Sequence, residues 1–99
     1  MLNITKKADG STLVMNLDGR LDTTTAPQLE TELKESLEGV TSLEFDIEKL
    51  QYISSAGLRV LLFAQKTMNK QGSMVVKNAC EEVMEIFEVT GFSDILTIE

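Results

Sequence analysis

Alternating apolar and polar positions near the start of the chain predict two strands that pair with each other. The first strand is expected over residues 2–7 and the second over residues 12–17. One face of the second strand is formed by Leu13, Met15 and Leu17. Residues 8–11 between them contain Asp-Gly, a strong signal for a β-hairpin, and Gly19 is expected to end the second strand.

Apolar residues spaced three or four positions apart predict three helices in the rest of the chain. The helices are expected at residues 25–38, 55–71 and 80–90. The residues that follow the helices are Gly39, Gly72 and Gly91, as is common at helix ends. Pro27 suits the first helical turn, and the threonines at residues 23–25 are N-cap candidates for the same helix.

Strands between these helices complete an α/β pattern. Apolar residues alternate with acidic ones over residues 43–48, which predicts a strand whose second face is wet near one end. Residues 74–76 form the next strand, and residues 95–98 are an optional last one. The order β-β-α-β-α-β-α(-β) predicts one α/β domain with a mixed four- to five-stranded sheet, whose later strands are parallel. Ligands and partners favour the carboxyl ends of such strands.

Length, composition and charge fit a single soluble domain that binds another protein. The 99 residues suffice for one hydrophobic core, and 42% apolar with 25% charged residues is ordinary for a chain that folds unaided. The formal charge of −7 opposes nucleic acid and anionic membranes, which favours a protein partner. The sequence shows neither a signal peptide nor a membrane-spanning run, so we expect a cytoplasmic protein.

The residue types that common catalytic sites need are missing. The chain has no histidine, which excludes a Ser-His-Asp triad, a Cys-His pair and nearly every catalytic zinc site. Neither a G-x-x-x-x-G-K nor a G-x-G-x-x-G loop occurs, so no cofactor is indicated. The single cysteine, Cys80, has apolar neighbours and is expected as a buried thiol on a helix. These observations predict a role without catalysis, cofactor or metal.

Two adjacent serines at the start of the second predicted helix are the best candidates for a functional site. Ser54 and Ser55 follow a strand directly. Serine is a favoured N-cap, so ordinary helix capping is one explanation. A helix N-terminus at the carboxyl end of a strand is also where a phosphate is best tolerated, so phosphorylation is the other. The residues alone leave both open.

Two segments resemble those of a known family. Residues 19–22 read Gly-Arg-Leu-Asp before a helix, and residues 52–58 read Tyr-Ile-Ser-Ser-Ala-Gly-Leu. Together they resemble a STAS domain, with the nearest similarity to the bacterial anti-sigma factor antagonists. The resemblance covers essentially the whole chain, since the length, the order of elements and the separation of the two loops agree. It implies one STAS domain over residues 1–99.

The serine loop of that family reads Asp-Ser-Ser/Thr-Gly-Leu, and one of its two hydroxyl positions is phosphorylated. Aligned on the Gly-Leu pair, Ser54 stands at the aspartate, Ser55 at the first hydroxyl position and Ala56 at the second. The resemblance therefore implies phosphorylation of Ser55, with Ser54 as the alternative. Asp22 would supply a nearby charge or only stabilise its own turn. The expected partner-binding residues are Asp22, Thr23, Ser54, Ser55, Ala56, Gly57 and Arg59.

By the same resemblance, the unphosphorylated protein binds an anti-sigma factor that is also a serine kinase of the histidine-kinase-like ATPase fold, which releases a sigma factor. Phosphorylation ends the binding, and a metal-dependent serine phosphatase restores it. The chain is then a substrate and a switch, not an enzyme. A different hypothesis keeps the STAS-like fold but makes the chain a non-switching subunit of a larger transporter or signalling assembly. In that case the serine would only cap its helix.

Overall fold

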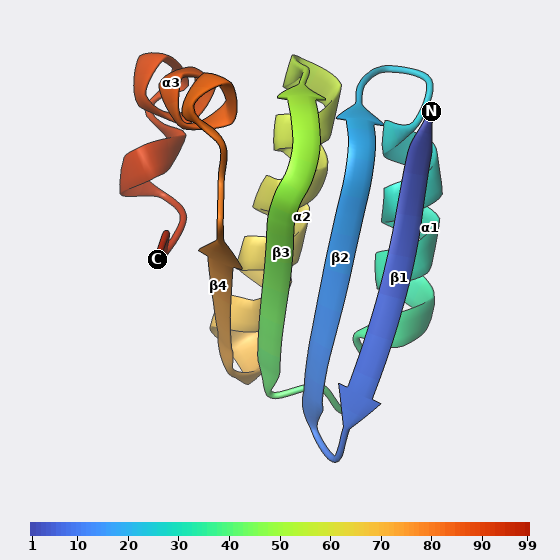
Figure 1. Ribbon diagram of the computed structural model, residues 1–99. Coiled ribbons are helices and arrows are strands. Elements are labelled where there is room, and N and C mark those ends of the chain that lie inside the picture. The colour runs from blue at the N-terminus through green and yellow to red at the C-terminus, as the bar shows by residue number, and fades with distance from the viewer.

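Four strands form one mixed sheet in the computed structural model, which describes residues 1–99 (Figure 1). The strands are β1 (Leu2–Asp9), β2 (Thr12–Leu21), β3 (Ser42–Ile53) and β4 (Ser73–Lys77). The helices are α1 (Ala26–Ser36), α2 (Ser55–Gln71) and α3 (Glu81–Thr90), followed by the 3-10 turn η1 (Phe92–Asp94). The strands lie in chain order, with β1 antiparallel to β2 and with β2, β3 and β4 parallel. The predicted α/β fold is confirmed.

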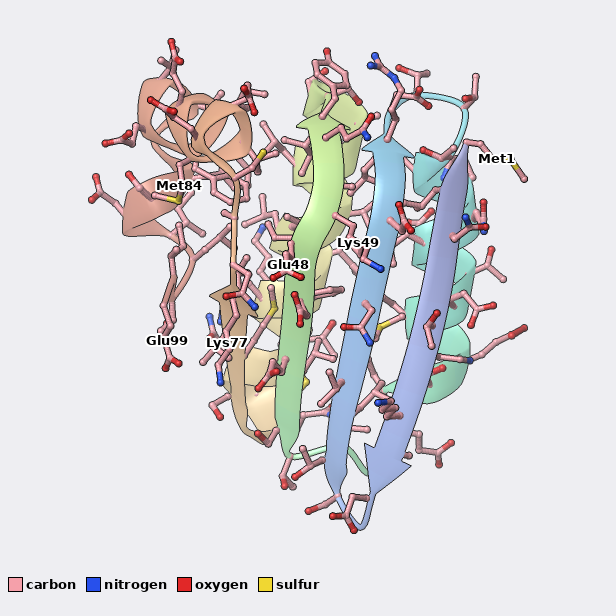
Figure 2. The ribbon with its side chains drawn as sticks, viewed as in Figure 1. Met1, Glu48, Lys49, Lys77, Met84 and Glu99 are labelled. Carbon is pink, nitrogen blue, oxygen red and sulfur yellow. The ribbon has the colours of Figure 1, made fainter.

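Helices cover one face of the sheet and leave the other open. Figure 1 shows α1 behind β1 and β2, α2 behind β3, and α3 beyond the carboxyl end of β4. The predicted inward-facing residues of the two central strands are all buried: Leu13, Met15, Leu17, Leu43, Phe45 and Ile47. Each such side chain stabilises the fold by about 1.5–3 kcal/mol relative to its exposed state. The open face is polar, and Glu48 and Lys49 lie on it (Figure 2).

Gly19 was predicted to end the second strand, but it lies inside the strand, opposite a bulge of β3. β2 continues to Leu21, and its pairing with β3 is irregular between Gly19 and Arg20. Gly19 has a φ of 114°, and a Cβ at this position would collide with the carbonyl oxygen of Met1. Only glycine adopts this backbone conformation without strain. A glycine inside a strand therefore marks the close approach of another backbone segment here, not the end of the strand.

β3 extends five residues beyond the predicted end, to Ile53. The prediction stopped early because two irregularities interrupt the alternation of apolar and polar residues in this strand. Its register against β2 shifts between Asn16 and Asp18 and again between Gly19 and Arg20. The buried positions after Ile47 are consequently Leu50 and Ile53, three residues apart. A search for apolar residues at every second position therefore does not identify this part of the strand.

The ends of two other elements also differ from the predictions. α1 ends at Ser36 instead of Glu38, with Leu37 as its C-cap. The optional last strand is a single parallel bridge between Val76 and Ile98. The amide of Val76 donates to the Thr97 carbonyl at 2.8 Å, and the amide of Glu99 donates to the Val76 carbonyl at 2.9 Å. The carboxylate of Glu99 lies 3.8 Å from the Lys77 ammonium (Figure 2).

Cys80 lies at the rim of the core and not inside it, contrary to the prediction. α3 begins at Glu81, so Cys80 is its N-cap and precedes the buried stripe that starts at Val83. The half-buried thiol donates to the Leu50 carbonyl at 3.4 Å.

None of the three helices has the length and hydrophobicity that crossing a membrane requires.

Candidate functional site at the carboxyl ends of β2 and β3

The two loops singled out in the sequence lie side by side at one edge of the sheet. β2 and β3 are parallel, and their last residues, Leu21 and Ile53, are paired. Carboxyl ends of parallel strands meet at the same edge, so the loops that follow them are neighbours. A direct hydrogen bond joins the loops, since the amide of Ser54 donates to the Leu21 carbonyl at 2.8 Å. The loops therefore form one continuous surface.

The two serines have different environments. Ser54 is the N-cap of α2, with extended φ and ψ of −95° and 175°, and its hydroxyl oxygen accepts from the Gly57 amide at 3.3 Å. It is half-buried. Ser55 is the first helical residue, is exposed, and its hydroxyl has no hydrogen-bond partner within the chain. One hydroxyl is thus used for capping, while the other is free.

Gly57 allows the first turn of α2 to pack directly on the ends of the two strands. It is buried, and a Cβ at this position would lie 2.6 Å from Leu21 Cγ and 2.9 Å from Ile53 Cγ1. These distances are shorter than any van der Waals contact between carbon atoms. Gly57 therefore positions the serine turn without contributing a side chain to the surface.

Asp22 stabilises the loop that leads from β2 to α1. Its Oδ1 accepts hydrogen bonds from the Thr24 hydroxyl at 2.7 Å, the Thr24 amide at 3.0 Å and the Thr25 amide at 3.1 Å. These bonds, foremost the one from the Thr24 hydroxyl, lower the pKa of Asp22, and partial desolvation opposes them. Asp22 is therefore ionised near neutral pH, and it stabilises its turn whatever else it does.

Contrary to the prediction, the threonines before α1 do not cap the helix with a side-chain hydrogen bond. Thr25 occupies the N-cap, but its side chain makes no capping bond. Its buried hydroxyl instead accepts from the Asp22 amide at 2.8 Å and donates to the Arg20 carbonyl at 2.9 Å. The Asp22 carbonyl accepts from the Ala26 amide at 2.8 Å. The sequence Asp-x-Thr-Thr, which is typical of an Asx turn, could have indicated this arrangement.

Arg20 and Tyr52 form a stacked pair next to both loops, although neither was predicted as a site residue. They are paired residues of β2 and β3, and the Arg20 guanidinium carbon lies 4.5 Å from the centre of the Tyr52 ring. Arg20 Nε lies 3.9 Å from Asp22 Oδ2. Both side chains are exposed. Their equivalent positions before the two loops are the signal that could have identified them.

The remaining predicted residues line a shallow groove between α1 and α2. The groove has a volume of about 320 Å³, and Thr23, Ala56 and Arg59 contribute to it beside Pro27 and Phe63. Arg59 is exposed and forms no ion pair. The structure thus gathers every predicted partner-binding residue at one end of the molecule, with Gly57 beneath the surface. No group of three or more side chains that commonly bind metals lies close together.

Comparison with known proteins identifies the family. The model of the STAS domain matches residues 3–99. The chain belongs to the STAS domain family. Among STAS relatives, BtrV of Bordetella bronchiseptica, named as a candidate anti-sigma factor antagonist, is 38% identical over 94 residues, which are 93% of this chain and 80% of BtrV. The anti-sigma-B factor antagonist of Bacillus subtilis is 30% identical over 98 residues, which are 98% of this chain and 90% of that protein.

Solved structures show the same STAS fold. The anti-sigma factor antagonist SpoIIAA in its unphosphorylated form has a TM-score of 0.76 at 18% identity, covering 100% of this chain and 87% of that one. An anti-sigma factor antagonist from Mycobacterium paratuberculosis has a TM-score of 0.89 at 18% identity, covering 99% and 85%. The family model and the curated relatives confirm the resemblance seen in the two loops, and these structures agree with it in fold.

Proposed function

We propose that this STAS protein is an anti-sigma factor antagonist that is switched at Ser55. The unphosphorylated form binds an anti-sigma factor that is also a serine kinase, and so frees a sigma factor. Phosphorylation of Ser55 ends the binding, and a metal-dependent serine phosphatase restores it. ATP and the catalytic groups belong to these partners, so the chain acts as a substrate and a binding module, not as an enzyme.

The difference between the two serine hydroxyls is the main support for this site. The Ser55 hydroxyl is exposed and unbonded, whereas Ser54 is half-buried and caps α2 through the Gly57 amide. In the transfer, Ser55 Oγ would attack the γ-phosphorus of ATP, its proton would pass to a base of the kinase, and ADP would leave. Ser55 can react in this way while the cap stays intact.

A phosphate at Ser55 would act on binding more than on folding. It adds about −1.5 to −2 charges beside the free amides at the start of α2, where the helix dipole favours an anion. In a docked complex, however, the same charge would lose water close to the ionised Asp22. An unpaired buried charge costs roughly 3–5 kcal/mol, which corresponds to an affinity loss of roughly a hundredfold to several thousandfold.

Phosphate incorporation tests this proposal. The purified chain is incubated with ATP and the serine kinase that co-purifies with it, and the modified residue is located by mass spectrometry. We expect one phosphate on Ser55, none on the Ser55→Ala variant, and continued incorporation into the Ser54→Ala control. In calorimetry, Ser55→Asp should weaken binding to the same kinase and leave the circular dichroism spectrum unchanged.

The alternatives give different results in these experiments. A phosphate on Ser54 of the wild-type chain would contradict the choice of residue but keep the switch in the same turn. A chain that takes up no phosphate would instead support a non-switching subunit of a larger assembly, in which Ser54 and Ser55 have only structural roles.

A further inference from the structure

The charges of α2 differ from those of the rest of the chain. α2 contains Arg59, Lys66 and Lys70 and no acidic residue. The complete chain has nine basic and sixteen acidic residues, so every acidic residue lies outside this helix. We refer to Arg59, Lys66 and Lys70 as the cationic strip.

The strip lies along the outer face of α2 and begins close to Ser55. At about 100° per residue, its three members fall within about 40° of one another around the helix axis, and Ser55 lies within about 60° of each. All four residues are exposed. The buried face of α2, which includes Leu58 and Leu61, is on the opposite side, toward the sheet (Figure 1). At about 1.5 Å per residue, the strip extends roughly 16 Å from Arg59 to Lys70.

No member of the strip is paired within the chain. Four of the other six basic residues form ion pairs: Lys6, Arg20, Lys34 and Lys77. The three cations of α2 have no carboxylate within 4.0 Å, although acidic residues outnumber basic ones in the chain. The strip is therefore free to pair with carboxylates of another molecule.

We propose that the cationic strip docks an acidic, carboxylate-rich face of the anti-sigma factor kinase. This inference rests on the proposed function, because it assigns the chemistry of the partner that acts on Ser55. The strip and the Ser55 hydroxyl share one helix face, so one partner can contact both. A protein suits the strip better than a polyanion, since three cations are few for nucleic acid or a membrane.

The strip also gives the phosphate a direct effect on docking. Ser55 and Arg59 are four residues apart, and helical side chains point toward the N-terminus, so Arg59 reaches back toward position 55. In the free chain, an exposed phosphate with about two negative charges would offset most of the positive charge of the strip. Phosphorylation would then weaken the attraction of Lys66 and Lys70 for the acidic face of the partner.

Two charge-reversal variants test the inference. Lys66→Glu/Lys70→Glu changes the strip and leaves Arg59 in place. Lys7→Glu/Lys49→Glu is the matched control, because it makes the same change in net charge at two exposed, unpaired lysines on the open face of the sheet. Binding to the anti-sigma factor kinase is measured at two salt concentrations, and circular dichroism melts confirm that both variants fold.

The strip variant should bind the kinase at least about tenfold more weakly at low salt, with a smaller salt dependence, and the control should stay within about twofold of wild type. Equal losses for both variants, or no loss for the strip variant, would overturn the inference while the proposed function stands. Failure of the wild-type chain to bind any such kinase would overturn both. Strip-dependent binding to phosphatidylserine vesicles or duplex DNA, with binding to the kinase unchanged, would overturn the assignment to a protein.

Discussion

Replacing the two adjacent serines one at a time is expected to affect stability differently. Ser54→Ala removes the acceptor of the Gly57 amide, and loss of an N-cap costs about 0.5–2 kcal/mol. The bond is 3.3 Å long, beyond the usual range for a strong hydrogen bond, so we expect the lower part of that range, about 0.5–1 kcal/mol. Ser55 has no such bond, and alanine favours a helix over serine by a few tenths of a kcal/mol, roughly. Ser55→Ala should therefore be neutral or slightly stabilising.

Thermal unfolding measures this difference directly. An unfolding entropy of about 2.1 cal/mol/K per residue gives about 0.2 kcal/mol/K for a domain of this size. The cap loss should therefore lower the Tm of Ser54→Ala by about 2–5 °C, while Ser55→Ala stays within about 1 °C of wild type or above it. Ser54→Asp is the control, because aspartate keeps an acceptor at the N-cap and should recover the wild-type Tm.

Equal melting temperatures for the two alanine variants would refute the reasoning. Such a result would show that the Ser54 hydroxyl does not cap α2 in solution. The two hydroxyls would then be equally free, and the structural reason for preferring Ser55 as the phosphorylated residue would disappear.

Three further changes test other parts of the site. Gly57→Ala should lower the free energy of unfolding by about 1–3 kcal/mol through overpacking. A double-mutant cycle with Leu21→Ala, measured by denaturant unfolding, should show a coupling energy above about 0.5 kcal/mol, and additive effects would argue against the close contact. Because the fold lowers the pKa of Asp22, its carboxylate stabilises the protein above about pH 4 and this contribution is lost as pH falls through the folded pKa. Asp22→Asn should flatten the pH dependence of stability in acid, and an unchanged slope would contradict this. Gly19→Ala should lower the Tm more than Gly10→Ala, since both have positive φ but only Gly19 faces a backbone collision; a similar loss in both would mean that the collision relaxes.

The order of elements could be predicted because, within most helices and strands, apolar residues recur at one constant spacing. Leu43, Phe45 and Ile47 alternate, and they are buried together against the helices. The end of β3 could not be predicted in this way, because its bulges change the spacing of buried residues to three, at Leu50 and Ile53. Bulges depend on the neighbouring strand, which local periodicity does not describe.

The proximity of the two loops was expected, whereas the hydrogen bonds within them were not. The resemblance to the STAS family implied that Asp22 lies near the serine loop, and the structure brings the two loops together because they follow adjacent parallel strands. Which hydroxyl caps and which stays free depends on backbone angles at single residues, as the contrast between Ser54 and Ser55 shows. Thr25 illustrates the same point, since its hydroxyl bonds to the turn and not to the helix that it precedes.

The hydrogen bond between the Ser54 amide and the Leu21 carbonyl would determine the form in which a kinase for Ser55 meets this chain. Together with the packing of Gly57 on Leu21 and Ile53, it fixes Ser55 on a folded surface instead of an extended segment. A synthetic peptide of residues 50–62 lacks that bond, that packing and the Asp22 loop, so it should be a very poor substrate at any concentration. A kinase that acts on Ser55 would not phosphorylate unfolded chains. The phosphorylated fraction would therefore contain only folded molecules.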